Sequence, residues 1–348
     1  MSKWIDFSSD ERLVMIQNVA KSLNIDELAV EKDWWVTAVL QAVFRTKAAK
    51  YLLFKGGTSL SKGWDFINRF SEDVDLALNR TFFLKELGIQ CANCNNKTQI
   101  HNLREKGQDY IYGTFKEELK KQLANLKLDV NILTEQEATD NHKIPHDKDP
   151  SVIYIEYPSI YNLKNSYTIP RIKLEISVLS MSEPYEKREI QSLIEKYFKG
   201  VDDDLVQIIP IVSPSRTFLE KAFLLCEEYQ RKQPRTRRMT RHFYDLERLM
   251  DTSYAKKALK DRSLYHSVVD HRRKFYALGY VNYYKDLPGR ITIVPKEELL
   301  PLYKADYDEM KESFIYGKAL DFEDLIGRLK ELQKRFRAIA HKPLIINH

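Results

Sequence analysis

The sequence has few of the residues and segments that mark secreted and membrane proteins. Three cysteines in 348 residues, an odd and sparse set, argue against a disulfide framework. No apolar run approaches the length that spans a bilayer, and residues 1–6 lack the charged-then-apolar layout of a secretory signal. We therefore expect a cytoplasmic protein without a membrane partner.

What the sequence does contain is an ordinary globular composition, 43% hydrophobic and 30% charged, at a length that suits two domains. The net charge of +6 arises from 56 basic and 50 acidic residues, and these are unevenly spread. Residues 68–75 are locally acidic, whereas residues 231–242 hold six Arg or Lys and a His. An acidic site together with a basic surface suits a polyanion that is bound and processed through metal ions.

The hydrophobic pattern predicts an α+β fold. Apolar residues at helical spacing predict helices over residues 9–22, 26–46 and 102–125, and a helical turn over 58–64. The candidate strands are residues 51–55, 73–78, 127–132, 152–157 and 171–177. Because strand candidates follow one another without an intervening helix, we expect a mixed or antiparallel sheet rather than a doubly wound one.

The chain changes character near residues 205–213. Ser213-Pro214 is a helix-start signal, and Thr217 and Glu220 stand at capping-box spacing. From there the pattern is mostly helical, with one extended piece at residues 290–294. We therefore predict two domains, residues 1–210 and residues 211–348.

Asp73 and Asp75 are the strongest candidates for chemistry. Separated by one residue on a predicted strand, they project to the same face. Two such carboxylates can hold one or two Mg²⁺ ions, which stabilise the attacking and leaving oxygens in nucleotidyl transfer. The Asp-x-Asp pattern alone is common, and a solvated strand edge is the alternative.

The preceding segment strengthens this interpretation. Gly56 and Gly57, between a strand and a helical turn, allow the backbone to approach phosphates, and Thr58 and Ser59 offer hydroxyls. A Gly-Gly pair alone is more often only a turn. A strand, Gly-Gly-Thr-Ser, a helical turn and then Asp-x-Asp on a strand together resemble the polymerase-β-like nucleotidyltransferase signature.

Four segments narrow the resemblance. Val30-Glu31-Lys32-Asp33-Trp34-Trp35, residues 54–60, residues 69–76 and Phe218-Leu219-Glu220-Lys221 are similar to the AbiEii/AbiGii toxin nucleotidyltransferases, which include the MenT-like toxins. The similarity extends with gaps from about Glu31 to Leu249. It implies a bacterial toxin of a toxin–antitoxin (abortive infection) pair, with a cognate antitoxin. It also implies an NTP substrate (ATP, GTP, CTP or UTP), Mg²⁺ and, for some members, transfer to tRNA ends.

A third carboxylate is expected on a neighbouring strand. Glu175 is the candidate, since strand alternation puts it on one face with Lys173 and Ser177. Asp129 is the second candidate, and a solvent-facing strand residue is the alternative for either. We predict Asp73, Asp75 and Glu175 as metal ligands.

The second domain supplies candidates through the resemblance. Lys221 is implied as a triphosphate-binding cation, and a surface Lys on an amphipathic helix is the alternative. The family's Lys-Asp-x-x-Asp motif aligns with Arg241 to Asp245, where only the last Asp is retained. We predict that Asp245 orients Lys221 or the nucleotide, with an Arg241–Asp245 ion pair as the alternative. His242 could bind phosphate, act as a base or be structural.

Further contacts are predicted beside these residues. Arg69 and Ser71 flank the carboxylates and are predicted to touch phosphate and the metal–nucleotide complex. The basic run, Arg231, Lys232, Arg235, Arg237, Arg238 and Arg241, is predicted to bind an RNA backbone, with a solvated, mobile loop as the alternative.

A zinc site is not expected. Cys91 and Cys94 have zinc-ligand spacing, but no second cysteine pair completes a set of four, since His101 is near and Cys226 is remote.

The sequence thus predicts a Mg²⁺-dependent nucleotidyltransferase that transfers NMP from an NTP to RNA, with a tRNA 3′ end preferred. Its active site is expected in the cleft between the domains, to which the helical domain contributes Lys221 and Asp245. The alternatives are transfer to a protein side chain, and a non-catalytic nucleotide- or RNA-binding protein of the same fold.

Overall fold

The computed structural model describes residues 3–71, 73–90, 94, 96–139, 142–161 and 170–339. The chain divides into two units. Unit 1 comprises Met1–Asp65 and Phe70–Val212, and unit 2 comprises Phe66–Arg69 and Ser213–His348. Unit 2 is therefore discontinuous in sequence, because Phe66–Arg69 belongs to it while the flanking residues on both sides belong to unit 1.

Unit 1 is built on one sheet. Within the described ranges it has seven strands, in the order β3-β4-β5-β2-β1-β7-β6. In chain order the strands are β1 (Leu52–Lys55), β2 (Asp73–Leu78), β3 (Asn131–Thr134), β4 (Ser151–Glu156), β5 (Arg171–Ser177), β6 (Tyr185–Ile190) and β7 (Gln207–Val212).

The sheet is mixed. β2 runs parallel to β5 and β1 runs parallel to β7, whereas the other neighbouring pairs are antiparallel. Strand alternation is clear in β2, where Val74 and Leu76 are buried and Asp73 and Asp75 are half-buried. The predicted α+β class with a mixed sheet is confirmed.

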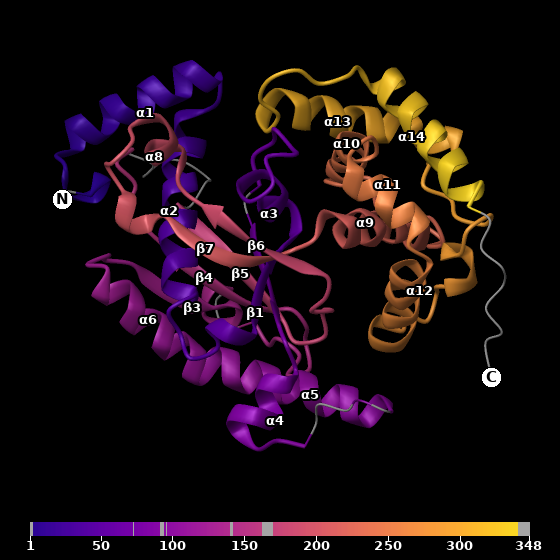
Figure 1. The fold of residues 1–348 in the computed structure, drawn as a ribbon, viewed down its shortest axis with the longest axis horizontal. Helices are drawn as coiled ribbons and strands as arrows, with labels where there is room; N and C mark the ends of the chain where they lie inside the picture. The colour runs from indigo at the N-terminus through magenta and orange to yellow at the C-terminus, as the bar shows by residue number, and fades with distance from the viewer. Residues whose placement is uncertain are drawn as a thin grey trace. The chain divides into compact units, whose positions relative to one another are not determined.

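Helices pack around this sheet. They are α1 (Ser9–Leu23), α2 (Glu27–Val43), α3 (Gly56–Lys62), α4 (Thr81–Leu87), α5 (Lys97–Tyr110), α6 (Lys116–Asn125), α7 (Glu135–Ala138) and α8 (Leu193–Tyr197). α2 is largely buried and contacts α1, α6, α8 and β5 (Figure 1). α1 begins with a capping box, in which Ser8 and Glu11 each accept a hydrogen bond from the other's backbone N–H.

Three sequence predictions for unit 1 need correction. The helix predicted over 102–125 is two helices, α5 and α6, joined by a π-helical turn at Ile111–Phe115. The strand predicted over 127–132 begins only at Asn131, because Lys127 has a φ of +59° and ends the preceding helical segment. β6 and β7 were not among the predicted strands. The side chains of β6 are mostly charged and exposed, as suits a strand at the edge of a sheet, and β7 contains Pro210.

Unit 2 is helical and centres on the almost wholly buried α9 (Pro214–Glu228). Its other helices are α10 (Thr240–Leu249), α11 (Ser253–Lys260), α12 (Arg262–His271), α13 (Leu300–Ser313) and α14 (Phe322–Arg337). α9 contacts α10, α11 and α12, and α10 in turn contacts α13 and α14. No helix in the described part of the chain is both long and apolar enough to cross a membrane.

The start of α9 was predicted correctly in part. Ser213 is the N-cap, accepting a hydrogen bond from Ser215 N at 3.4 Å, and Pro214 occupies the first turn. The capping box predicted at Thr217 and Glu220 is wrong, because both residues lie inside the helix and Glu220 pairs with Arg216 instead.

The short piece Phe66–Arg69 is bound into unit 2 by its backbone. Asn68 O accepts a hydrogen bond from Tyr316 N at 2.9 Å, and Asn68 N donates to the Tyr244 hydroxyl at 3.2 Å. Arg69 also forms an isolated β-bridge with Ile315. These bonds fix the backbone from which the Arg69 side chain extends.

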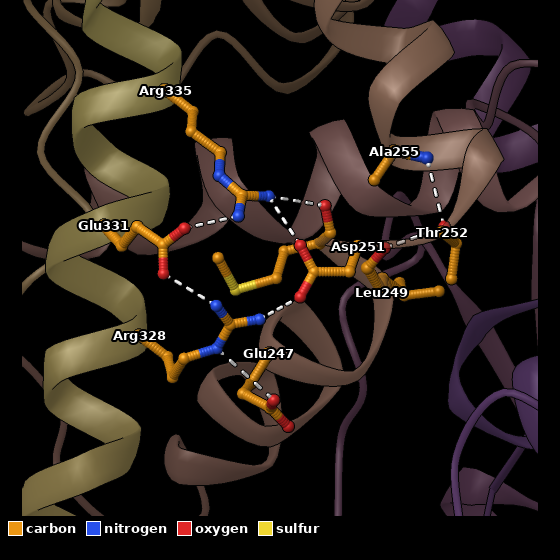
Figure 2. A network of polar contacts seen from close by, with 9 residues as sticks. Glu247, Leu249, Asp251, Thr252, Ala255, Arg328, Glu331 and Arg335 are labelled. Atoms are coloured by element: carbon orange, nitrogen blue, oxygen red, sulfur yellow. Dashed lines mark hydrogen bonds and ion pairs between the residues drawn. The ribbon is translucent and has the colours of Figure 1, made fainter.

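A network of charged side chains joins α14 to the end of α10 (Figure 2). Arg328 and Arg335 both bind the Asp251 carboxylate, Arg335 at 2.8 Å, and both also bind Glu331 of their own helix. Arg335 donates a further hydrogen bond to Met250 O at 3.0 Å. The two arginines thus join Glu331 of α14 to Asp251, and Arg328 also lies 3.7 Å from Glu247 of α10 (Figure 2).

Candidate active site

The carboxylates of unit 1 lie on the same face of two adjacent strands. In the parallel pairing of β2 with β5, Asp73 lies opposite Lys173 and Asp75 lies opposite Glu175. Residues paired in register project to the same side of a sheet. The strands therefore bring together three of the predicted site residues, Asp73, Asp75 and Glu175, on one half-buried face.

Gly56 closes one side of this group. β1 pairs with β2 so that Lys55 lies opposite Asp75, and Gly56 follows with a φ of +79°, which favours glycine. A Cβ atom at Gly56 would lie 2.8 Å from Cγ of Asp75, closer still to a carboxylate oxygen, and would displace that side chain. Glycine is required here both for its backbone conformation and for the close approach of Asp75.

The hydroxyls of Thr58 and Ser59 are used within the fold. Thr58 Oγ1 donates a hydrogen bond to Asp73 O, and Ser59 Oγ donates to Gly56 O at 2.9 Å. Gly57, Thr58 and Ser59 are all buried. Thr58 thus ties the start of α3 to the start of β2, and nucleotide contact by these hydroxyls stays a prediction.

α3 is held from its other end by a buried ion pair. Lys62 Nζ lies 2.7 Å from Asp33 Oδ1 and donates hydrogen bonds to Thr37 Oγ1 and Gln191 O. Because the Lys62 side chain is only 4% exposed, these acceptors replace water around its charge. The position of the Gly56–Ser59 segment is therefore fixed by both ends of α3.

Glu175 has a cation beside it that the sequence analysis left without a role. Lys173 Nζ forms an ion pair with the Glu175 carboxylate, and both side chains are partly exposed. Burial opposes the charge of Lys173, but the hydrogen bond to Glu175 and the charges of Glu175 and Asp73 raise its pKa. The sequence could have indicated this pair, since Lys173 and Glu175 are two residues apart on one strand and share a face.

Asp129 is not placed where a third carboxylate is needed. It is exposed and lies in the loop before β3, which is the edge strand two places away from β5. Of the two candidates, Glu175 is the one that lies beside Asp75.

The donor set of this face fits Mg²⁺ in its chemistry. Carboxylate oxygens are the ligands that this ion prefers, and Mg²⁺ sites commonly use one or two carboxylates completed by water and substrate phosphate. Asp73 and Asp75 supply such a pair, while Glu175 already has Lys173 as a partner. No group of three or more His, Cys, Asp or Glu poised around a metal position occurs among the residues that the structure describes.

In unit 2, two predicted site residues, Arg69 and Lys221, bind the carboxylate of a third, Asp245. Arg69 binds Asp245 with two nitrogens, Nε to Oδ1 at 2.7 Å and Nη2 to Oδ2 at 2.8 Å. Lys221 Nζ lies 2.8 Å from the same Oδ2. Asp245 is fully buried and the two cations nearly so. Arg69, Lys221 and Asp245 therefore form one buried, hydrogen-bonded cluster.

The cluster shifts the pKa of each of its members. Burial disfavours the charge of Asp245, but Arg69 and Lys221 outweigh it and hold the pKa of this carboxyl well below its usual range. Burial also lowers the pKa of Lys221, against the attraction of Asp245 and with the repulsion of Arg69. Two cations share one anion, so the cluster has an excess of positive charge.

Arg241 and His242 lie beside this cluster. Asp245 pairs with Arg69 and Lys221 rather than with Arg241, so the ion pair four residues apart on α10 is not what holds the carboxylate. Burial, followed by the charges of Lys221 and Arg241, lowers the pKa of His242 well below its usual value. His242 is therefore neutral near pH 7.

The remaining predicted residues are distributed over both units. Ser71 is half-buried in the segment before β2. Arg231, Lys232, Arg235, Arg237 and Arg238 lie in the loop between α9 and α10, and Arg241 is in the first turn of α10. Cys91 lies outside the described residues, whereas Cys94 is buried.

Together, a mixed sheet, paired carboxylates on an inner strand and a glycine that abuts one of them define the class of nucleotidyltransferases. Comparison with known families gives the particular group. Residues 38–337 match the nucleotidyl transferase AbiEii toxins of type IV toxin–antitoxin systems, so the chain belongs to this family. The chain is a nucleotidyltransferase, and its family implies an NTP substrate and an antitoxin as partner.

Two further comparisons add less. No match is found among curated proteins. A solved structure to which the chain is similar is MenT4, a nucleotidyltransferase toxin from Mycobacterium tuberculosis H37Rv. The two share 15% sequence identity at a TM-score of 0.42, with 94% of this chain and 90% of that chain covered.

Proposed function

We propose that this protein is a Mg²⁺-dependent toxin that transfers an NMP from an NTP to RNA in the cytoplasm, with the 3′ end of a tRNA as the preferred acceptor. A hydroxyl oxygen of the acceptor attacks the α-phosphorus of the NTP. The bond from the α-phosphorus to the bridging oxygen breaks, and pyrophosphate leaves.

The observation that carries this proposal is the register of β2 with β5. It sets Asp75 beside Glu175 and Asp73 beside Lys173, on a face that Gly56 leaves open for the Asp75 carboxylate. Like charges at paired positions of neighbouring strands repel one another, and Lys173 already pairs with Glu175 on this face. Such an arrangement is stabilised by a bound cation, which favours a metal-dependent reaction.

Asp73 and Asp75 would hold the metal, with Glu175 as the third carboxylate. One or two Mg²⁺ ions, when bound, stabilise the charge that develops on the attacking and leaving oxygens. The protein's own contribution is to orient the two carboxylates. Thr58 helps here by binding Asp73 O, which fixes the first residue of β2.

The nucleotide would be bound by residues of both sequence motifs. Gly56, Gly57, Thr58, Ser59, Arg69 and Ser71 are the proposed contacts near the phosphates. Lys221 is the proposed triphosphate-binding cation, and Asp245 orients it through the 2.8 Å ion pair. The excess positive charge of the Arg69–Lys221–Asp245 cluster supports binding of an anionic ligand.

RNA is the proposed acceptor because of the basic loop between α9 and α10. The proposed RNA-binding residues are Arg231, Lys232, Arg235, Arg237, Arg238 and Arg241. Neutralising phosphates with such residues releases counterions and makes binding depend steeply on salt. The alternative acceptor is a protein side chain, and an experiment must distinguish transfer to protein from transfer to RNA.

The test is incorporation of label from each α-³²P-labelled NTP into total RNA and total protein, with and without Mg²⁺. We expect label in the tRNA fraction only with Mg²⁺, and none with Asp73→Asn. Glu189→Gln, an exposed carboxylate on the edge strand β6, is the matched control and should label normally. Label in protein alone would overturn the RNA acceptor, and label in neither would favour a binding role without transfer.

Growth provides the test of the toxin assignment. Expression of the wild-type chain alone in bacteria should stop growth, and the Asp73→Asn variant expressed to the same level should not. Normal growth with the active enzyme would contradict toxicity while leaving the transfer reaction standing.

A further inference from the structure

The loop between α9 and α10, residues 229–239, is ordered by two carboxylate acceptors, the buried Glu228 and the half-buried Asp306. Glu228, with a side chain only 2% exposed, accepts hydrogen bonds from Arg235 N at 2.8 Å and Arg235 Nε at 3.0 Å. At the other end Asp306 of α13 accepts from Met239 N and Thr240 N at 3.1 and 3.0 Å. The basic loop is thus pre-organised rather than a free segment, and binding a ligand on it costs little ordering entropy.

An exposed aromatic ring lies against this loop. The guanidinium carbon of Arg231 is 4.5 Å from the centroid of the Tyr280 ring, and both side chains are more than a third exposed. Arg231 is oriented by Glu228, with Nε 3.1 Å from Oε1. A guanidinium over an exposed aromatic ring makes a flat, cationic surface.

The segment that carries Tyr280 is fixed to the same loop. The Gln230 side chain accepts a hydrogen bond from Asn282 N at 2.8 Å and donates to Asn282 O at 3.4 Å. These two bonds join the residue before Arg231 to a residue two positions after Tyr280, and so fix the distance between the two segments. The stacking of Arg231 on Tyr280 does not depend on the two side chains alone.

The loop that carries Arg231 holds further exposed cations. Lys232 and Arg237 are exposed, and Arg235 is 60% exposed even though it pairs with Glu228. A surface of this kind matches an RNA strand, whose phosphates bind Arg and Lys and whose unpaired bases stack on aromatic rings and guanidinium planes. A duplex does not offer base faces for stacking, so the surface favours an unpaired segment.

We propose that Arg231 and Tyr280, with the flanking cations of residues 229–239, form a stacking platform for an unpaired nucleotide of RNA. The inference rests on the proposed function, since it names the surface that would hold the RNA acceptor. It adds a base-stacking contribution, which does not depend on salt, to the phosphate contacts of the basic loop.

The test is binding of a single-stranded RNA that contains 2-aminopurine, followed by its fluorescence over a salt series. Tyr280→Leu should weaken binding by about 5- to 100-fold, the usual effect of losing one stacked base, and leave the salt slope unchanged. Tyr280→Phe and Tyr280→Trp should bind as tightly as wild type, because both keep a ring. Arg237→Gln should instead reduce the slope by about one.

Tyr185→Leu is the matched control and should leave RNA affinity unchanged, since Tyr185 is a tyrosine on β6 of unit 1 that is even more exposed than Tyr280. Equal affinity of Tyr280→Leu and wild type would overturn the platform, as would an equal loss in Tyr280→Phe. The labelling assay distinguishes failure of the stacking platform from failure of the RNA-acceptor proposal. Wild-type protein that labels RNA while Tyr280→Leu binds normally refutes only the platform, and label in protein alone refutes the acceptor proposal.

Discussion

The two units gather charge in opposite ways. On the β2–β5 face of unit 1, Asp73, Asp75 and Glu175 lie together, partly exposed, with Lys173 as a neighbouring cation. In unit 2, Arg69 and Lys221 both pair with Asp245, and all three side chains are buried. The first group has an excess of negative charge and the second an excess of positive charge.

The difference in burial gives the two groups different effects on stability. A cluster of like charges near water lowers stability slightly and gains from a cation. A buried carboxylate with two cations is different, because removing it leaves uncompensated charge in a place that water does not reach. Substitutions in the first group should therefore mainly change activity, and substitutions in the second should also change stability.

The largest expected effect is on activity in unit 1. Asp73→Asn or Asp75→Asn should reduce NMP transfer by about 100-fold or more, since even substitutions one shell away from a metal cost about 10- to 100-fold. The melting temperature should stay the same or rise, because one of two repelling charges is gone. Transfer rates and thermal unfolding of the same preparations measure both. Near-normal turnover in either variant would falsify the assignment of these carboxylates.

The largest expected effect on stability is in unit 2. Asp245→Asn should lower the free energy of unfolding by about 3–5 kcal/mol, because Arg69 and Lys221 lose their buried counter-ion. Adding Lys221→Met should recover part of this loss by removing one of the stranded cations. Urea unfolding measures it, with Glu309→Gln on exposed α13 surface as control. A wild-type unfolding curve for Asp245→Asn would break the distinction between the two groups.

The pH dependence of stability tests whether ion pairing or burial determines the direction in which the pKa of a buried carboxyl shifts. The pKa of Asp245 is held low in the fold, so its stabilisation is present above about pH 4 and is lost as the pH falls. Asp245→Asn should accordingly flatten the acid side of the stability curve. Melting temperatures between pH 2 and pH 5 give the comparison.

Asp286 should behave in the opposite way. Burial, and then the charge of Glu227, raises its pKa to about 8, so the carboxyl stabilises the fold while protonated. This stabilisation is complete below about pH 4 and is lost as the pH rises through 8. Asp286→Asn should gain stability over wild type between pH 5 and pH 9. If Asp245→Asn and Asp286→Asn change the pH dependence of stability in the same pH range, ion pairing does not determine the direction of the pKa shift and burial alone does.

The smallest effect is expected at the α14 network of Figure 2. The side chains of Arg335, Glu331 and Asp251 are 30%, 46% and 55% exposed, and exposed ion pairs contribute roughly 0–1 kcal/mol. Arg335→Gln should therefore lower the melting temperature by at most about 2–4 °C. The loss should be smaller in high salt, because salt screens exposed charges. A loss as large as that of Asp245→Asn would show that burial is not what separates these groups.

The sequence predicted the elements whose patterns are local. β2 and β5 follow strict alternation and begin and end where they were predicted, and Ser213 with Pro214 marked the start of α9. The strand predicted over 127–132 failed because a left-handed residue, Lys127, interrupts it. β6 was missed because an exposed edge strand has no apolar alternation.

The site was predictable only in pieces. The spacing of Asp73 and Asp75 indicated a shared face, but the partner strand and the register that brings Glu175 beside Asp75 depend on tertiary pairing. The pairing of Arg69 with Asp245 joins residues 176 positions apart, which no local pattern contains. The roles of these residues in catalysis and binding stay predictions until the variants are measured.

The discontinuity of unit 2 has a consequence for the order of events during synthesis. Arg69 leaves the ribosome 176 residues before Asp245, and at typical elongation rates this takes on the order of ten to thirty seconds. Through that interval the nascent chain has Asn68 and Arg69 without the partners that later fix them. The helical unit can be completed only after α10 and residues 315–316 have emerged, so a fragment that starts at Ser213 would leave Asp245 with Lys221 but without Arg69.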